Sequence, residues 1–268
     1  MRKARPPRAP AARKEVARKP AAKLLRIAGL PAVSALFATS PERVERLFFD
    51  DRMKPLTGAF CMALARARKP YRVVPPDELE RVAGTVLHGG IVAVAQPRAL
   101  TELDLAAAER WAKDGQPLLL LDGIGNPHNL GAIARSAAFF GLPRLVLSDH
   151  PEQAQPSDAS YRVAEGGLEH VTLYRAPRFA QTLKGLRRCY RVFGTALGGG
   201  EPLAALRRGE KPIALVLGNE EHGLPRATLD ACDAIVTIPG TGAVQSLNVS
   251  ASAAIFLYAL RNSTGHQS

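Results

Sequence analysis

From residue 117 onward, short apolar runs alternate with segments of helical periodicity. The apolar runs predict strands at Leu118–Asp122, Arg144–Leu147, His170–Tyr174, Arg191–Thr195, Ile213–Leu217 and Ala234–Ile238. Apolar residues at helical spacing predict helices at Asn129–Phe140, Arg178–Leu186 and Ser246–Leu260. Strands that are apolar along their whole length are buried on both faces, which is typical of a mostly parallel sheet covered by helices. The pattern therefore predicts an α/β domain.

The residues before this region predict a second, smaller α/β unit. Its expected elements are a helix at Leu56–Arg68, a strand at Tyr71–Val74, a helix at Asp77–Val82 and a buried strand at Ile91–Ala95. The next segment is helical in part and ends in the turn dipeptide Asp114-Gly115, so it is interpreted as a linker. The expected organisation is a tail over 1–26, a small domain over 27–97, a linker over 98–116, a main domain over 117–262 and a tail over 263–268.

Positive charge is concentrated at the N-terminus. The formal net charge is +12, of which residues 1–26, with ten Lys or Arg and the single acid Glu15, contribute +9. Such a segment cannot bury apolar surface and is predicted to be disordered. Basic tails bind polyanions, chiefly nucleic acid, by releasing counterions and without selecting a sequence. A solubilising extension is the alternative interpretation.

Cysteine and histidine patterns argue against several classes of site. Cys61, Cys189 and Cys232 are far apart and form no C-x-x-C pair, and the six histidines show no H-E-x-x-H spacing. We therefore expect no metal site and no disulfide framework, and a reducing cytoplasm is the simplest location. No uninterrupted apolar run of about 18 residues occurs, so no membrane-spanning helix is expected.

The first segment that carries candidate chemistry is L-L-L-L-D-G-I-G-N-P-H-N-L-G-A-I-A-R, residues 118–135. A buried strand leads into a loop and a helix, the place where α/β sheets bind ligands. It is not a dinucleotide fingerprint, because His128 stands where the third glycine belongs and Pro127 intrudes. Few charged residues lie near Arg135 on its predicted helix, so it either binds an external phosphate or pairs with a distant carboxylate. The sequence leaves both possibilities open.

Two further segments combine a strand end with small or polar residues. Residues 213–225 end a buried strand in Gly218, where backbone can approach a ligand closely, and Glu220 follows it. Residues 238–254 contain Ser246, expected to be the N-cap of the final helix, followed by Asn248 and several Ser and Ala. The alternatives without a functional role are an ordinary turn for the first segment and a closely packed core helix for the second.

Together the three segments resemble the signature motifs of the SpoU–TrmH family of RNA ribose 2′-O-methyltransferases. N-P-H-N-L-G-A-I-A-R, L-G-N-E-x-x-G-L and I-P-x-x-G-x-x-x-S-L-N-V-S occur in the family's order over about residues 117–262. Residues 29–33 and 88–93 resemble, more weakly, the family's substrate-binding domain, an α/β fold shared with kink-turn-binding ribosomal proteins. Residues 47–50, together with the N-terminal domain, resemble the family's YfiF-like members.

The resemblance implies a trefoil-knotted SPOUT domain that binds S-adenosylmethionine, acts on tRNA or rRNA and forms a homodimer through the knot. The residues that match the family's catalytic set are Asn129, Arg135, Glu220, Ser246 and Asn248. The residues that match its cofactor-binding positions, or lie beside them, are Thr195, Ala196, Leu217, Gly218, Ile238 and Leu247. A knot is a rare exception among folds, and periodicity does not predict one.

The expected chemistry is the transfer of an activated methyl group to a ribose hydroxyl whose proton is being removed. Arg135 is expected to bind the target phosphate and to help deprotonate the hydroxyl, either in its own subunit's site or in the neighbour's. Asn129, Ser246 and Asn248 would then orient the sugar, and Glu220 would hold the polar network. Alternatives are a non-catalytic RNA-binding assembly factor and a knotted methyltransferase acting on a base.

This chain departs from the family pattern in two places. Glu221 stands where many members have glycine, which puts the shape of that loop in question. Residues 161–167, Y-R-V-A-E-G-G, replace a more usual stretch of small residues. Neither departure changes a residue of the catalytic set.

Overall fold

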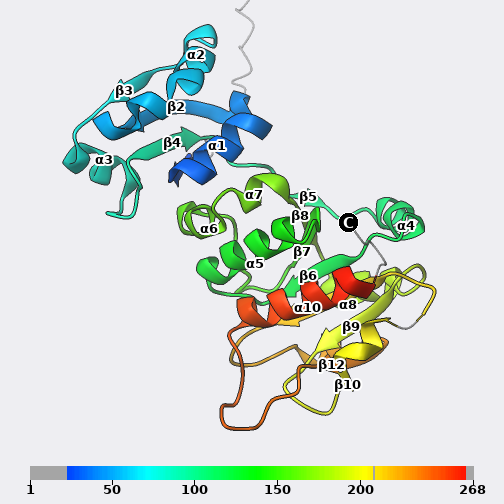
Figure 1. Ribbon diagram of the computed structural model, residues 1–268. Helices are drawn as coiled ribbons and strands as arrows, with labels where there is room; N and C mark the ends of the chain where they lie inside the picture. Colours follow the sequence, from blue (N-terminus) through cyan, green and yellow to red (C-terminus); the bar gives the residue numbers. More distant parts are fainter. Residues whose placement is uncertain (1–22, 208, 264–268) are drawn as a thin grey trace, which may run out of the picture.

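The computed structural model describes residues 23–207 and 209–263, which form a smaller N-terminal unit and a larger C-terminal one (Figure 1). The larger unit is built on an eight-stranded sheet in the order β10-β12-β9-β11-β6-β7-β8-β5, and each neighbouring pair is parallel. Its strands are β5 (Thr101–Glu102), β6 (Leu118–Asp122), β7 (Arg144–Ser148), β8 (Thr172–Ala176), β9 (Arg191–Thr195), β10 (Glu201–Pro202), β11 (Ile213–Gly218) and β12 (Ala234–Thr237). The predicted α/β class with a parallel sheet is confirmed.

Helices cover both faces of this sheet because successive strand residues point to opposite sides. Leu119 and Leu121 of β6 share a core with α5 and α10, whereas Leu118 and Leu120 share a second core with α4 and α8. The helices and the 3-10 turn of this unit are α4 (Leu105–Lys113), α5 (Pro127–Phe139), α6 (Asp158–Ala164), α7 (Gly167–His170), α8 (Phe179–Leu186), α9 (Arg226–Leu229), α10 (Val249–Ser263) and η3 (Leu203–Arg207).

The smaller unit has a four-stranded sheet in the order β1-β4-β2-β3, in which β4 runs antiparallel to both of its neighbours. Its centre is β4, which is almost fully buried, as its continuous apolar run predicts. The elements are β1 (Leu25–Ala28), α1 (Leu30–Thr39), η1 (Pro41–Arg43), β2 (Val44–Phe49), η2 (Asp51–Leu56), α2 (Gly58–Arg66), β3 (Tyr71–Val73), α3 (Pro76–Ala83) and β4 (Ile91–Ala95).

Several expected boundaries need correction. Leu25 and Arg26, placed by the sequence in the tail, lie in β1, while residues 1–22 and 264–268 lie outside the described residues. The predicted linker over 98–116 contains β5, which pairs with β8, and α4, which packs on α8. Apolar residues of α4 therefore extend the core of the larger unit, a tertiary role that local periodicity does not reveal.

The two units are joined by charged contacts onto α6 and α7. The side chain of Glu169, fully buried on α7, accepts two hydrogen bonds of 2.8 Å from the Arg43 guanidinium, which also reaches the Tyr161 hydroxyl. Burial, followed by the nearby Glu169 carboxylate, raises the pKa of Tyr161. A second ion pair of 3.0 Å joins Arg26 of β1 to Asp158 at the start of α6. The smaller unit is thus held against the helices that flank α5.

The Arg43–Glu169 pair gives a stability prediction. Replacing Glu169 by Gln leaves the largely buried guanidinium of Arg43 without its counter-charge. Removing one partner of a buried pair costs about 3–5 kcal/mol, so we expect a loss of that order in the free energy of urea unfolding. Glu109→Gln, which removes an exposed partner of Lys113, should cost less than about 1 kcal/mol. Equal losses in the two variants would contradict the assignment.

Candidate active site

The helix that carries Asn129 and Arg135 follows the carboxyl end of β6 after a short loop over 123–126. The Asn126 side chain caps α5 by accepting a 2.8 Å hydrogen bond from the His128 amide, and Pro127 takes the first helical position. Proline is favoured there because its missing N–H would have no partner in the helix. The helix therefore starts two residues before the predicted position, and Asn126-Pro127 is the sequence signal that marks its start.

Three of the five predicted catalytic residues meet in one hydrogen-bonded chain. Asn248 donates through Nδ2 to Oδ1 of Asn129 at 3.1 Å, and Nδ2 of Asn129 donates to the Glu220 carboxylate. These residues come from α5, the loop after β11 and the start of α10, which the fold brings to the same end of the sheet. Because a carboxylate only accepts hydrogen bonds, Glu220 fixes which end of the Asn129 amide faces it.

Asn219 shapes the loop that presents Glu220. Its side-chain oxygen accepts from the amides of Glu221 and His222, and its Nδ2 donates to the Gly123 carbonyl at 2.9 Å. Backbone bonds of 3.0 Å in both directions join Asn219 to Gly223, which closes the turn. Glu221 is exposed and is not among the described non-glycine residues with positive φ, so the loop accommodates it without backbone strain. The sequence reading missed Asn219, although Asn after a strand-ending glycine is a turn signal.

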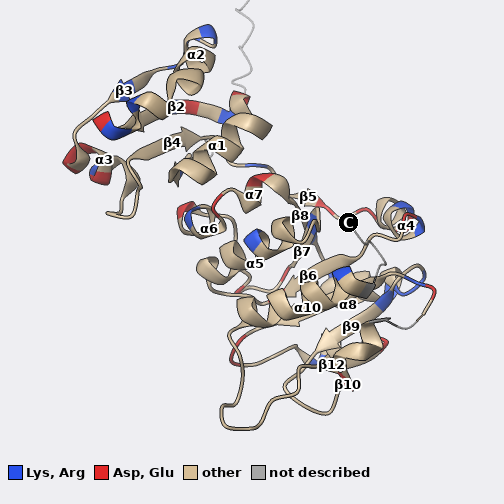
Figure 2. Cartoon of the chain, in the orientation of Figure 1, with Lys and Arg blue, Asp and Glu red and all other residues tan. Residues whose placement is uncertain are grey.

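Arg135 lies apart from this network in the same chain. It is six residues after Asn129, which places it about 9 Å along the helix and on a different face. Its guanidinium pairs with Glu165 at 2.9 Å, and both side chains are about half exposed, at 56% and 49%. The rest of α5 carries no Lys, Arg, Asp or Glu, and Figure 2 shows the helix tan along most of its length. Of the two possibilities that the sequence leaves open, the structure shows a carboxylate partner, in an exposed rather than a buried pair.

Ser246 does not have its expected structural role. Helix α10 begins at Val249, and Asn248 is the residue before it, accepting hydrogen bonds from the Ser250 amide at 2.8 Å and from its hydroxyl at 2.6 Å. The predicted N-cap at Ser246 is therefore wrong. Ser246 lies instead in an exposed loop over 239–248, and it takes no part in the bonded chain of Asn129, Glu220 and Asn248. Asn248 rather than Ser246 caps the helix because the two residues between Ser246 and Val249 are not helical.

Five of the six predicted cofactor residues lie at, or directly after, the carboxyl ends of three adjacent strands. The Thr195 hydroxyl donates to the Val216 carbonyl at 3.0 Å, and the Ala196 amide donates to the Val236 carbonyl at 3.2 Å, which links the ends of β9, β11 and β12. Leu217 is buried in the core and Gly218 ends β11, while Ile238 follows β12. Leu247 lies in the 239–248 loop with 47% of its surface exposed.

This region suits a ligand that is bound through backbone groups and apolar contacts. A Cβ on Gly218 would lie 2.6 Å from the Gly223 carbonyl carbon, so only glycine allows the loop to close this tightly on the strand end. The hydroxyl of Thr237, one residue before Ile238, is buried and has no hydrogen-bond partner in the described structure. Val244 and Leu247 expose apolar surface on the loop that follows β12. These groups fit S-adenosylmethionine, whose adenine ring has apolar faces and whose adenosine carries several hydrogen-bonding groups.

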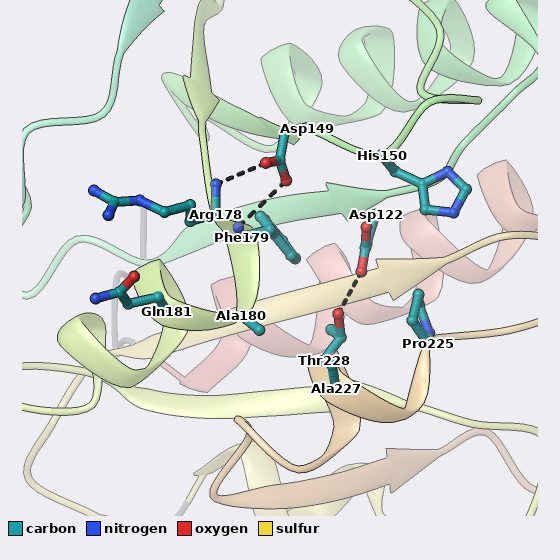
Figure 3. Close-up of a pocket in the computed structure, with 10 residues that line it drawn as sticks. All are labelled: Asp122, Asp149, His150, Arg178, Phe179, Ala180, Gln181, Pro225, Ala227 and Thr228. Carbon is teal, nitrogen blue, oxygen red and sulfur yellow. Dashed lines mark hydrogen bonds between the residues drawn. The ribbon is translucent and has the colours of Figure 1, made fainter.

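A cavity of about 350 Å³ opens elsewhere on the carboxyl edge of the sheet, between β6, β7, α8 and α9 (Figure 3). Asp149 there accepts from the amides of Arg178 and Phe179 at the start of α8, and Asp122 accepts from the Thr228 hydroxyl at 2.6 Å. None of the predicted site residues lines it. Both carboxylates already hold local structure, so the candidate chemistry lies with Asn129, Glu220 and Asn248.

Metal and thiol chemistry find no support among the described residues. No group of three or more His, Cys, Asp or Glu is placed to hold a metal ion there. All three cysteines are free thiols, and burial raises the pKa of each, that of Cys232 to about 12. A thiol with a raised pKa stays protonated near neutral pH and is a weak nucleophile. Within the described segments, no helix has the length and apolarity needed to cross a membrane.

Comparison with known families assigns both units. Residues 116–258 match the model of the SpoU rRNA methylase family, and residues 26–100 match the model described as RNA 2′-O ribose methyltransferase substrate binding. The chain is 36% identical over 244 residues to the uncharacterized tRNA/rRNA methyltransferase YfiF of Escherichia coli O157:H7, covering 91% of this chain and 69% of that one. It is 33% identical to the 23S rRNA (guanosine-2′-O-)-methyltransferase RlmB of Haemophilus influenzae, covering 87% and 95%.

Solved structures share the same architecture. The SpoU methyltransferase AviRb from Streptomyces viridochromogenes superposes with a TM-score of 0.70 at 25% identity, covering 90% of this chain and 89% of that one. An AdoMet-bound rRNA methyltransferase from Sinorhizobium meliloti superposes with a TM-score of 0.73 at 21% identity, covering 90% and 87%. Each likeness covers 90% of this chain, so the shared fold extends over both of its units.

Proposed function

This chain belongs to the SpoU rRNA methylase family, and we propose that it is an RNA methyltransferase that transfers the methyl group of S-adenosylmethionine to a ribose 2′-hydroxyl in tRNA or rRNA. The observation that carries the proposal is the bonded chain of Asn129, Glu220 and Asn248 beside the glycine-bearing end of β11. A non-catalytic relative would have no need for three polar side chains held in mutual register. The proposed place of action is the cytoplasm.

The proposed catalytic set is Asn129, Arg135, Glu220, Ser246 and Asn248. When bound, S-adenosylmethionine supplies an activated methyl group, so the protein's part is to place the hydroxyl in line with it and to take its proton. Asn129 and Asn248 carry amide groups that can hydrogen-bond a ribose, and Glu220 holds the Asn129 amide in one orientation. Ser246, in the exposed loop, is proposed to reach the sugar when the RNA is bound.

Arg135 is proposed to bind the phosphate of the target nucleotide. A guanidinium grips phosphate through two parallel hydrogen bonds, and it stays protonated at any ordinary pH. The proton of the 2′-hydroxyl therefore leaves most easily through the bound phosphate, while Arg135 neutralises the charge. The position of Arg135 on a different face of α5 from Asn129 favours a site completed by the partner subunit.

A homodimer formed through α5 and α10 would bring Arg135 to the partner's site. Phe139 follows Arg135 by one helical turn and is 78% exposed, and Tyr258 of α10 is 60% exposed. The ring of Phe140 contacts both of them edge-on, so the three rings form one aromatic patch. Exposed aromatic surface on adjacent helices favours burial against a second copy. Arg135 would then lie at the rim of that interface.

The proposed trefoil knot involves the segment that ends in α10 (red in Figure 1). Phe256 and Leu257 of α10 share a core with Leu206 of η3 and Ala137 of α5. Helix α10 therefore packs between two elements that precede it by 40 residues or more. A chain end that passes through an earlier loop would pack in this way, and the proposed cofactor residues 195–196, 217–218, 238 and 247 would then lie around it.

Methyl transfer from radiolabelled S-adenosylmethionine tests the function. Unmodified transcripts of 23S rRNA, 16S rRNA and tRNA would be incubated with the protein, digested to nucleosides and separated by mass spectrometry. We expect a 2′-O-methylated nucleoside from one transcript class. A methylated base instead would show a different reaction. RNA binding without methylation of any transcript or of total cellular RNA would favour an assembly factor.

A further inference from the structure

The segment between α6 and α7 lies against the backbone of Arg135 on one side and against the N-terminal unit on the other. A Cβ on Gly167 would lie 2.7 Å from the Arg135 Cα, and a Cβ on Gly166 would lie 2.9 Å from the Ala35 Cβ of α1. Glycine is therefore required at both positions for the segment to fit. The turn Glu165–Gly167 is a wedge between the proposed catalytic helix and the substrate-binding unit.

Glu165 occupies an unusual place in this wedge. It follows α6 with φ 45° and ψ 44°, a left-handed conformation that glycine normally takes after a helix. Of the described non-glycine residues, only Arg68 and Arg178 share a positive φ. A residue with a side chain takes this conformation only at a cost in free energy, so it persists where surrounding contacts impose it. The wedge thereby directs a carboxylate toward Arg135, in the stretch where this chain departs from the family's small residues.

We propose that Glu165 is a positioning residue that holds the Arg135 guanidinium until the phosphate of the substrate RNA displaces the carboxylate. The inference rests on the proposed role of Arg135. A carboxylate and a phosphate present similar pairs of oxygens to a guanidinium, so they compete for the same donors. The Arg135–Glu165 pair is half exposed, and exposed pairs are weak, so a phosphate displaces Glu165 easily.

The positioning role has a consequence for substrate choice. An RNA that binds only through non-specific electrostatic attraction finds the charge of Arg135 already neutralised by Glu165. An RNA aligned by the N-terminal unit has its phosphate next to the wedge and can displace Glu165. Arg43 and Arg26 fix that unit to the two ends of the α6–α7 segment, through Glu169 and Asp158. Glu165 thus favours aligned RNA over loosely bound RNA.

The isosteric variant Glu165→Gln tests the pairing without any methyl transfer. We expect phenylglyoxal to modify Arg135 about two- to fivefold faster in this variant, the range set by loss of an exposed ion pair, as followed by peptide mass spectrometry. Arg135 stays accessible to the reagent because an RNA phosphate must reach it. Glu109→Gln removes a carboxylate paired with Lys113 on α4 and should leave the rate unchanged. An unchanged rate in Glu165→Gln would overturn the proposal.

Steady-state kinetics test whether Glu165 and the RNA phosphate compete for Arg135. The substrate is the unmodified transcript that the protein methylates. In Glu165→Gln the KM for RNA should fall about two- to fivefold at low salt, kcat should move less than KM, and the gain should shrink as salt is added. A merely structural role would not give this salt-dependent split. An equal or higher KM would overturn the proposal.

A double-mutant cycle shows whether Glu165 acts through Arg135. In an Arg135→Ala background, Glu165→Gln should leave the directly measured Kd for the same transcript unchanged. If the substitution raised RNA affinity there as much as it does with Arg135 present, Glu165 would act only by repelling RNA, and the proposal would be overturned. Retained methyl transfer in Arg135→Ala would instead refute the proposed role of Arg135. The phenylglyoxal rate separates these two failures, since it reports on the pair alone.

Discussion

Arg135→Ala is expected to lower kcat/KM for methyl transfer by about 10²- to 10⁴-fold, the range for disabling proton removal, because the phosphate that takes the proton is no longer held in place. The side chain is half exposed and its ion pair is superficial, so the fold should survive the change. Affinity for S-adenosylmethionine should remain nearly the same, because the proposed donor site lies at the ends of β9, β11 and β12. Calorimetry with the donor and single-turnover methylation of the transcript provide the two measurements.

The same variant tests whether the site spans two subunits. Arg135→Ala and Asn129→Ala, coexpressed with different tags and purified as the mixed dimer, leave one site with both residues intact if Arg135 acts on the partner. We expect about half of the wild-type activity from that dimer, since one of its two sites is complete. If Arg135 served its own subunit, neither site would be complete and the mixed dimer would be inactive. Full activity in a monomer would also contradict the arrangement.

Much of the fold follows from local pattern. Leu118–Asp122 and Ile91–Ala95 are observed as predicted because a wholly apolar run between turn residues has few alternatives to a buried strand. The first strand and helix of the N-terminal unit were not predicted individually. Leu25 and Arg26 adjoin the basic tail and share its composition, so the sequence did not indicate a strand there. The strand forms because these residues pair with β4.

The site was harder to predict than the fold. Asn129, Glu220 and Asn248 could be named from their motifs, and the structure places them in contact. The partner of Arg135 could not be named, because Glu165 is 30 residues away and its direction depends on a left-handed backbone conformation. Ser246 was predicted to be the N-cap because serine is a common cap residue before an apolar helical pattern. The structure differs because an exposed loop continues to Asn248 and the helix begins only at Val249.

Gly218→Ala is expected to weaken binding of S-adenosylmethionine by about 10- to 100-fold. The added methyl group would lie 2.6 Å from the Gly223 carbonyl carbon and 2.7 Å from the Leu224 nitrogen, so the loop must move away from the strand end. Overpacking of this kind costs about 1–3 kcal/mol, and each 1.36 kcal/mol is tenfold in affinity. That displacement would also shift Glu220, two residues on. Calorimetric titration with the donor measures the effect.

Gly198→Ala is the matched control. Gly198 follows β9 in the same region, its φ is not in the left-handed range, and an added Cβ would meet nothing within 4 Å. Its donor affinity should therefore stay within about twofold of the wild type, a change below 0.5 kcal/mol, as for ordinary surface substitutions. Thermal unfolding of both variants separates a local effect from loss of the fold, because Gly218→Ala should still unfold cooperatively. A folded Gly218→Ala protein that binds the donor as well as Gly198→Ala would place the donor site elsewhere than the closed turn after β11.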